Sequence, residues 1–184
     1  LYPIATVSFA DFAEAHPDGL VLSRDTGMAR NYGQNPYSGY DTGGNGTLYP
    51  AAFDDSFADA RARVLAIRRH ESVAIFQEHL LAERVVEFVV DDVALVALLA
   101  HGTATPLQAH TVALGRHFGA TGVLVASLDG EPISLVPIEG GGFEDQRTGS
   151  RWNVFGMATE GELAGRRLRP VEHLDTFWFA IATF

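Results

Sequence analysis

The sequence has 184 residues, a formal net charge of −10 and 47% hydrophobic residues, which predicts a packed chain of one domain or at most two small ones. A uniformly acidic chain repels the phosphate backbone, so we expect no nucleic-acid partner. The sequence contains neither Cys nor Lys. These absences exclude disulfides, thiolate nucleophiles and Cys-ligated metals, together with Schiff-base catalysis and a phosphate-binding Walker lysine.

A helix followed by a short strand is predicted near the N-terminus. Ser8 and Asp11 resemble a capping signal, and Phe9 and Phe12 follow at helical spacing. The run His-Pro-Asp-Gly at 16–19 ends this helix, because Pro and Gly favour a turn. The apolar residues of 20–23 then predict a buried strand.

Residues 24–50 predict a long structured loop, since they include six Gly and four Tyr but few aliphatic residues. Within it, residues 41–46 resemble a calcium-binding loop but lack its alternating oxygen ligands and distal Glu. Asn45-Gly46-Thr47 fits the acceptor pattern for N-glycosylation.

The middle of the chain predicts helices and strands in alternation. Residues 85–90 and 93–99 are nearly all apolar and flank Asp91-Asp92, so we expect a hairpin whose two strands both lie centrally in a sheet. Ahead of it we expect an acidic helix at 53–60, a strand at 63–68, a turn at 70–72 and a helix at 74–83.

Further hairpins are predicted in the last third of the chain. Asp129-Gly130 suits a type I′ turn between strands at 123–128 and 132–138. Residues 143–171 predict three strands joined by turns at 148–149 and 160–161, and residues 174–184 predict an apolar helix that packs inside the molecule. The predicted fold class is α+β, made mainly of antiparallel β hairpins with short packing helices.

The two ends of the chain resemble each other. Residues 1–4 and 12–15 align without gaps with 168–171 and 179–182, although Phe and Ala are common enough here for coincidence to remain an alternative. The chain begins with Leu1 and shows no leader pattern. We therefore expect residues 1–184 to form a single domain that is a processed product, a fragment, or one half of a duplicated β-rich protein.

The longest apolar region, residues 85–100, is interrupted by Glu87, Asp91 and Asp92 and is shorter than the roughly 20 residues of a membrane helix. We expect no membrane span. No Gly-x-Ser-x-Gly or His-Glu-x-x-His motif is present, and the pairs His70/His79 and His101/His110 are each nine residues apart, which is no ligand spacing. The sequence therefore predicts no metal and no cofactor.

A set of motifs lies along most of the chain, at residues 20–27, 30–33, 35–37, 39–41, 102–104, 119–122, 148–153, 162–165, Leu168, Pro170, His173 and 177–180. Together these motifs resemble the bacterial and archaeal family of domain of unknown function 3179. The resemblance implies a β-rich domain, often duplicated and often exported or lipid-anchored, with no established activity. Some members carry a Cys-containing motif before Gly-Thr-Ala, where this chain has Ala100-His101.

Three functional hypotheses follow. The first is a non-catalytic extracytoplasmic binding or interaction domain, whose partner is a small molecule, a protein or a second copy of itself. The second is a hydrolase-like or metal-assisted enzyme that uses Asp25 or a His. The third is a purely structural half of a duplicated protein, with an exposed apolar face on the C-terminal helix.

Polar residues that follow the predicted strand at 20–23 could form a ligand pocket, with Arg binding an anionic group and Tyr and Asn orienting it. The alternative is a buried ion pair between Arg24 and Asp25 that holds the loop in place. We expect Trp152 in the core with its indole N–H bonded to a loop carbonyl, and His173 as a structural histidine. The candidate pocket residues are Arg24, Asp25, Arg30, Tyr32, Asn35, Tyr37, Tyr40, His101, Thr103, Arg147, Trp152 and Asn153.

Overall fold

A computed structural model of the chain describes residues 4–32, 34–42 and 57–182. The calcium-like loop and the glycosylation tripeptide lie largely or wholly outside these ranges, as do residues 53–56 of the predicted acidic helix. The remainder of that prediction, residues 57–60, forms bends and a turn. The described part of the chain is α+β, with mostly antiparallel strands in small sheets and a few short helices, as the sequence predicted.

The central sheet has the strand order β3-β4-β5. The predicted hairpin is confirmed: β3 (Val85–Val90) pairs with β4 (Val93–Ala100) from Val85↔Leu98 to Val90↔Val93. β5 (Ala120–Val125) pairs along the other side of β4. Only β4 is therefore a central strand, and the prediction that β3 is also central is wrong.

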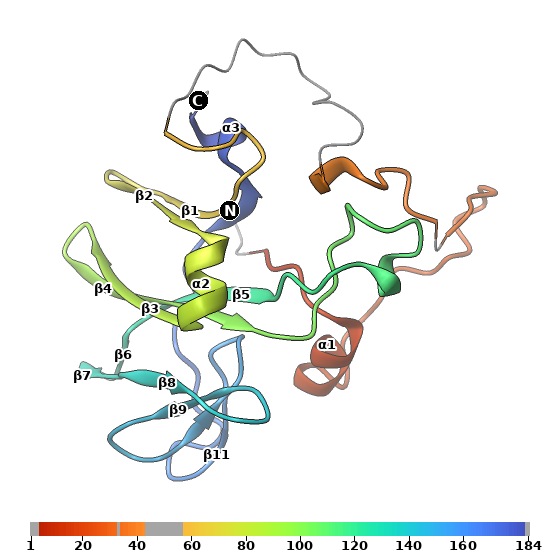
Figure 1. The fold of residues 1–184 in the computed structure, drawn as a ribbon. Helices are drawn as coiled ribbons and strands as arrows, with labels where there is room; N and C mark the ends of the chain where they lie inside the picture. The colour runs from red at the N-terminus through yellow and green to blue at the C-terminus, as the bar shows by residue number, and fades with distance from the viewer. Residues whose placement is uncertain (1–3, 33, 43–56, 183–184) are drawn as a thin grey trace.

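Both faces of β4 are buried, and successive side chains enter two different cores. Leu95, Ala97 and Leu99 pack in one core, whereas Val96 and Leu98 pack in the other. This arrangement explains the continuous apolar run of β4, because a strand with one solvated face would alternate with polar residues. The described part of the protein consequently has three layers, with the central sheet between two outer sheets (Figure 1).

One outer layer has the strand order β12-β1-β2 and includes β1 (Arg63–Arg68), β2 (Ser72–Phe76) and β12 (Leu174–Phe177). The helix predicted at 74–83 begins later, at α2 (Gln77–Glu83), because the first residues of that range pair with β1. The helix predicted at 174–184 likewise follows a strand, as α3 (Trp178–Ala182). Its described residues are half-buried or exposed, so the prediction that it packs inside is wrong.

The other outer layer has the strand order β11-β10-β9-β8, with β8 (Leu135–Pro137), β9 (Phe143–Asp145), β10 (Arg151–Trp152) and β11 (Ala158–Glu160). Beside it lies a small hairpin of β6 (Ser127–Leu128) and β7 (Glu131–Pro132). Asp129 and Gly130 between them have φ of 54° and 89°, as a type I′ turn requires, which confirms that turn. The hairpin is shorter than predicted, because β5 and β8 pair in other sheets.

The N-terminal segment begins with α1 (Phe9–Ala15). Ser8 caps this helix by accepting a hydrogen bond from the main-chain N–H of Asp11 at 3.1 Å, which confirms the predicted cap. The strand predicted at 20–23 is wrong: the segment pairs with no strand of the described chain, and Leu20 and Leu22 are 96% and 95% exposed. The loop that follows projects from the three layers, as Figure 1 shows, and includes the short 3₁₀ helix η1 (Tyr40–Thr42).

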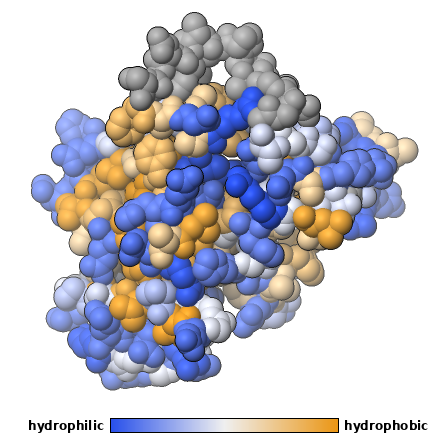
Figure 2. All heavy atoms as spheres, in the orientation of Figure 1, coloured by the Kyte–Doolittle hydropathy of each residue, from blue (hydrophilic) through white to orange (hydrophobic). Residues whose placement is uncertain are grey.

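The internal duplication stays a prediction. Residues 168–182 contain a strand followed by a helix, whereas residues 4–8 ahead of α1 form no strand. No helix among the described residues is long and apolar enough to cross a bilayer. On the face drawn in Figure 2, hydrophilic residues predominate, and hydrophobic residues gather over the outer sheet that contains β1 and β2.

Candidate functional site

The structure does not gather the predicted pocket residues in one place. Arg24, Asp25, Arg30 and Tyr32 are exposed on the projecting loop (Figure 1). Among the described residues, their hydrogen bonds join them to other residues of this loop, as in the contact of 3.3 Å between the hydroxyls of Thr26 and Tyr32. Among the described residues, Arg24 and Asp25 form no ion pair, so the alternative of a buried pair is wrong.

The next part of the loop, residues 35–41, docks on the main chain of residues 107–110. The N–H groups of Asn35, Gly39 and Asp41 donate to the carbonyls of His110, Gln108 and Leu107 at 2.8, 2.7 and 3.3 Å. The side-chain amide of Asn35 donates to the carbonyl of Ala109 at 2.9 Å. Four consecutive carbonyls therefore hold this segment, which we call the docked segment. Of its candidate residues, Asn35 is buried, Tyr40 half-buried and Tyr37 51% exposed.

A buried polar cluster ties the docked segment to the outer sheet. The Asp41 side chain is 1% exposed, accepts a hydrogen bond of 2.7 Å from the Thr105 hydroxyl and lies 3.8 Å from the Arg116 guanidinium. The Arg63 guanidinium lies over the rings of Phe118 and Phe177, 4.7 and 4.9 Å from their centroids. Burial lowers the pKa of Arg63, and the charges of Asp41 and Asp175 oppose that shift.

Thr103 is buried with its hydroxyl oxygen unpaired, on the extended segment that also carries Thr105. Arg147, by contrast, is exposed in the turn that follows β9. Neither residue is among those that line the cleft between α1 and the sheet of β10 and β11. The candidates His101, Trp152 and Asn153 do line it, so this cleft is the strongest candidate site.

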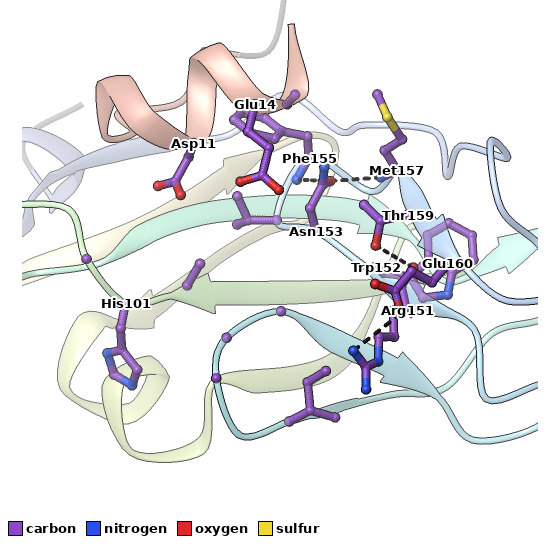
Figure 3. A pocket seen from close by; sticks show the side chains of 18 of the residues that line it. Asp11, Glu14, His101, Arg151, Trp152, Asn153, Phe155, Met157, Thr159 and Glu160 are labelled. Carbon is purple, nitrogen blue, oxygen red and sulfur yellow. Dashed lines mark hydrogen bonds and ion pairs between the residues drawn. The ribbon is translucent and has the colours of Figure 1, made fainter. Parts of the chain in front are cut away.

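The cleft has a volume of about 1150 Å³ and lies between α1 and the sheet of β10 and β11. Figure 3 shows Glu14 extending from α1 toward Asn153 and Asp11 on the same helix, with Arg151 and Glu160 on the far side and His101 apart from both. The bend at 140–142 closes another side, and all three of its glycines have positive φ. A side chain at Gly140 or Gly141 would meet no atom within 4 Å, so the main chain there is open to an approaching group.

Two of the predicted residues at the cleft have structural roles. The side-chain oxygen of Asn153 accepts hydrogen bonds from the N–H groups of Phe155 and Met157, both at 3.1 Å, and so forms the turn between β10 and β11. Trp152 is 1% exposed and packs in the core, as predicted. Its indole nitrogen has no hydrogen-bond partner among the described residues, so the predicted bond to a loop carbonyl is wrong.

The arginines at the cleft already have partners. The Arg84 guanidinium donates to the carbonyls of Ile138 and Gly142 at 3.1 and 3.3 Å and lies over the Phe143 ring. Arg84 is the left-handed C-cap of α2, so it joins that helix to the glycine bend. Arg151 forms an ion pair with Glu160 at 3.3 Å. Both positive charges are thus engaged within the protein.

The remaining carboxylates of the cleft, which lie on α1 and beside the glycine bend, are less engaged. Asp11 accepts a hydrogen bond of 2.7 Å from the Ser8 hydroxyl. Glu14 and Glu139 are exposed and have no hydrogen-bond or ion-pair partner among the described residues. The cleft therefore carries an excess of negative charge. The sequence interpretation missed these residues, although the spacing of Asp11 and Glu14 by three positions places them on one face of the predicted helix.

The described residues include no group of three or more His, Asp or Glu side chains placed to hold a metal ion. His101 is exposed at the cleft. His173 is buried at 5% exposure, and its Nδ1 lies 2.9 Å from the carbonyl oxygen of Val171, in keeping with the predicted structural role.

Comparison with known proteins agrees with the resemblance drawn from the motifs. Residues 1–184 match the family described as "Protein of unknown function (DUF3179)". No curated protein and no solved structure matches the chain significantly. Because the match covers the full sequence, the chain belongs to the DUF3179 family.

Proposed function

We propose that this protein is a non-catalytic binding domain that holds a small, positively charged ligand in the cleft between α1 and β10–β11. The observation that carries the proposal is the charge balance of that cleft. Arg84 and Arg151 are engaged by carbonyls and by Glu160, whereas Glu14 and Glu139 have no partner among the described residues. A positively charged ligand would neutralise the unpaired carboxylates, whereas an anion would be repelled by them.

The size and lining of the cleft suit such a ligand. Small-molecule sites are typically about 300–1,000 Å³, and this cleft, at about 1150 Å³, leaves room for water around the ligand. Phe155 and Met157 line it beside the carboxylates and offer contacts for an apolar ligand body. The open main chain at 140–142 allows close approach from the opposite side.

Three probes of equal length test the charge preference: pentane-1,5-diamine, pentane-1,5-diol and glutarate. Isothermal titration calorimetry at low salt is expected to show binding of the diamine and no measurable binding of glutarate. Glu14→Gln should weaken diamine binding by roughly fivefold, because a partly exposed charge pair contributes about 1 kcal/mol or less. The control Glu162→Gln changes an exposed carboxylate outside the cleft and should leave binding unchanged. Equal binding of diamine and diol, or no effect of Glu14→Gln, would contradict the proposal.

The proposal includes a site of action outside the cytoplasm, and the family resemblance supports this part. Externally added protease should degrade the full-length protein in intact cells of its source. Protection until the cells are lysed would contradict an extracytoplasmic location.

A second candidate function is self-association through residues 20–22. Leu20, Val21 and Leu22 are 96%, 63% and 95% exposed, and the described chain supplies no strand that pairs with them. An exposed apolar run of this kind is typical of an interaction surface. Sedimentation velocity should show concentration-dependent dimers that Leu22→Asp abolishes. The control Leu114→Asp, at a leucine 79% exposed elsewhere, should leave the dimers intact. A protein that is monomeric at all concentrations would exclude this candidate.

A further inference from the structure

We propose that α1 is a lid over the cleft between α1 and β10–β11, closed when the cleft holds its positively charged ligand and open when the cleft is empty. This inference rests on the proposed function. α1 carries Asp11 and Glu14, which both line that cleft. A helix that swings away takes these two carboxylates out of the site, so the ligand binds to the closed form.

α1 is held weakly on the rest of the protein. None of its residues is buried, and Figure 1 shows the helix outside the three layers. No hydrogen bond or ion pair joins residues 4–19 to the other described residues. The N–H groups of Phe12 and His16, for example, donate to carbonyls within this segment. A segment with few buried contacts opens at a low cost in free energy.

Two apolar contacts hold the segment, one at each end of α1. Val7, which precedes the helix, is half-buried against the core. At the other end, the ring of His16 lies edge to face against the Phe155 ring, with the centroids 5.5 Å apart. The core contact of Val7 suits a hinge, and the exposed ring contact suits a latch. Phe155 itself lines the cleft, so the latch lies beside the ligand.

The chain that follows the latch leaves α1 free to move. Residues 20–32 are exposed, and in the described chain their hydrogen bonds stay within that segment. The first buried residue after the latch is Asn35, at the start of the docked segment. The connection between α1 and this anchor can therefore follow a movement of the helix without breaking a contact with the sheets.

The charges of the cleft link its occupancy to the position of α1. Asp11, Glu14 and Glu139 all line the cleft, and the last two have no hydrogen-bond or ion-pair partner among the described residues. In the empty cleft these like charges repel and favour the open form, whereas a bound cation favours the closed form. A ligand shifts an equilibrium of this kind because it binds one form more tightly than the other.

Hydrogen exchange with pentane-1,5-diamine tests the lid. An isolated helix of seven residues is unstable in water, so opening exposes the amides of Phe12 and His16 to exchange. A ligand that binds only the closed form, at about twenty times its Kd, slows this exchange about twentyfold. We expect that slowing at both amides, whereas the amide of Gly39 in the docked segment should be unchanged.

Three variants test the latch in the absence of ligand. His16→Ala removes the ring against Phe155 and changes no residue that lines the cleft, so the Phe12 amide should exchange roughly fivefold faster. His16→Phe keeps a ring at this position and should behave like the natural protein. His79→Ala, at an exposed histidine of α2, should also leave the exchange of Phe12 unchanged.

The outcomes separate this inference from the proposed function. If calorimetry shows diamine binding but the α1 amides exchange at an unchanged rate, the lid is excluded and the proposed function stands. Equal slowing at Gly39 would mean that the ligand stabilises the whole fold, which also excludes the lid. Absence of diamine binding would overturn both proposals. Unchanged exchange in His16→Ala would overturn the latch.

Discussion

Residues 20–32 and the docked segment at 35–41 are neighbours in sequence and differ in how they relate to the body of the protein. Residues 20–32 are exposed throughout, and in the described chain their hydrogen bonds stay within the segment. The docked segment donates four hydrogen bonds to consecutive carbonyls of 107–110 and buries Asn35 and the Asp41 side chain. Both contain several polar residues.

The difference shows that apolar content does not determine which part of this loop is anchored to the sheets of the protein. The three aliphatic residues at 20–22 stay exposed, whereas the docked segment has no aliphatic residue and is anchored. What distinguishes the docked segment is a set of donors matched to carbonyls, together with one buried carboxylate. Directed hydrogen bonds supply the specificity that hydrophobic burial lacks.

The largest expected loss of unfolding free energy comes from a substitution in the core. It provides the reference against which substitutions in the two segments are compared. Trp152→Ala should lower the free energy of unfolding by about 3–5 kcal/mol, because it empties a buried site of large volume. Trp152→Phe should cost less, since it also removes an indole N–H that has no partner among the described residues. Urea denaturation measures both. A larger loss for Trp152→Phe than for Trp152→Ala would contradict this account.

The second effect compares two aspartates of the same loop. Asp41→Ala should cost about 1.5–3 kcal/mol, because it removes the acceptor of the Thr105 hydroxyl and a charge that compensates the buried Arg63. Asp25→Ala, at an exposed position, should stay within about 0.5 kcal/mol of the natural protein. Equal stability of the two variants would contradict the proposed difference between the exposed segment and the docked segment.

The third effect is local and concerns Asn35. Asn35→Ala removes the bond to the Ala109 carbonyl and the acceptor of the Tyr37 N–H, at a cost of about 1–2 kcal/mol. Hydrogen exchange should show faster exchange at the amide of Gly39, which donates to Gln108. Asn31→Ala, in the exposed segment, should leave that amide unchanged.

The smallest effect is expected at the exposed apolar residues. Leu22→Ser should change the free energy of unfolding by no more than about 0.5 kcal/mol, because the side chain is 95% exposed in the isolated chain. Thermal denaturation at low concentration provides the measurement. A loss above about 1 kcal/mol would mean that residues 20–22 are buried in solution.

These contrasts explain which parts of the fold could be predicted from the sequence. The hairpin of β3 and β4 was predictable, because its apolar runs and its Asp91-Asp92 turn are local signals. Residues 20–23 have the same apolar character, but a strand also needs a partner, and a run of residues does not contain that information. The start of α2 was displaced for the related reason that Val73 and Ile75 pair with β1.

The candidate site was predicted less well than the fold. Polar residues that follow a strand were expected to converge, yet that strand does not form, and Arg24, Asp25 and Arg30 remain exposed. His101, Trp152 and Asn153 do lie at the cleft. The carboxylates of α1 that line the cleft were not predicted as site residues. The sequence shows that they share one helix face, but which elements lie opposite that face depends on tertiary packing.

The docking of residues 35–41 determines which positions on each side of the contact tolerate substitution. The carbonyls of 107–110 are offered by the peptide bond itself, so any residue at these positions presents the same acceptor. The other partner has no such freedom: Asn35 uses its side-chain amide, and Gly39 has φ of 77°, which residues with a side chain rarely adopt. Substitutions across relatives should therefore accumulate on the accepting side of this contact, while the donating side keeps its residues.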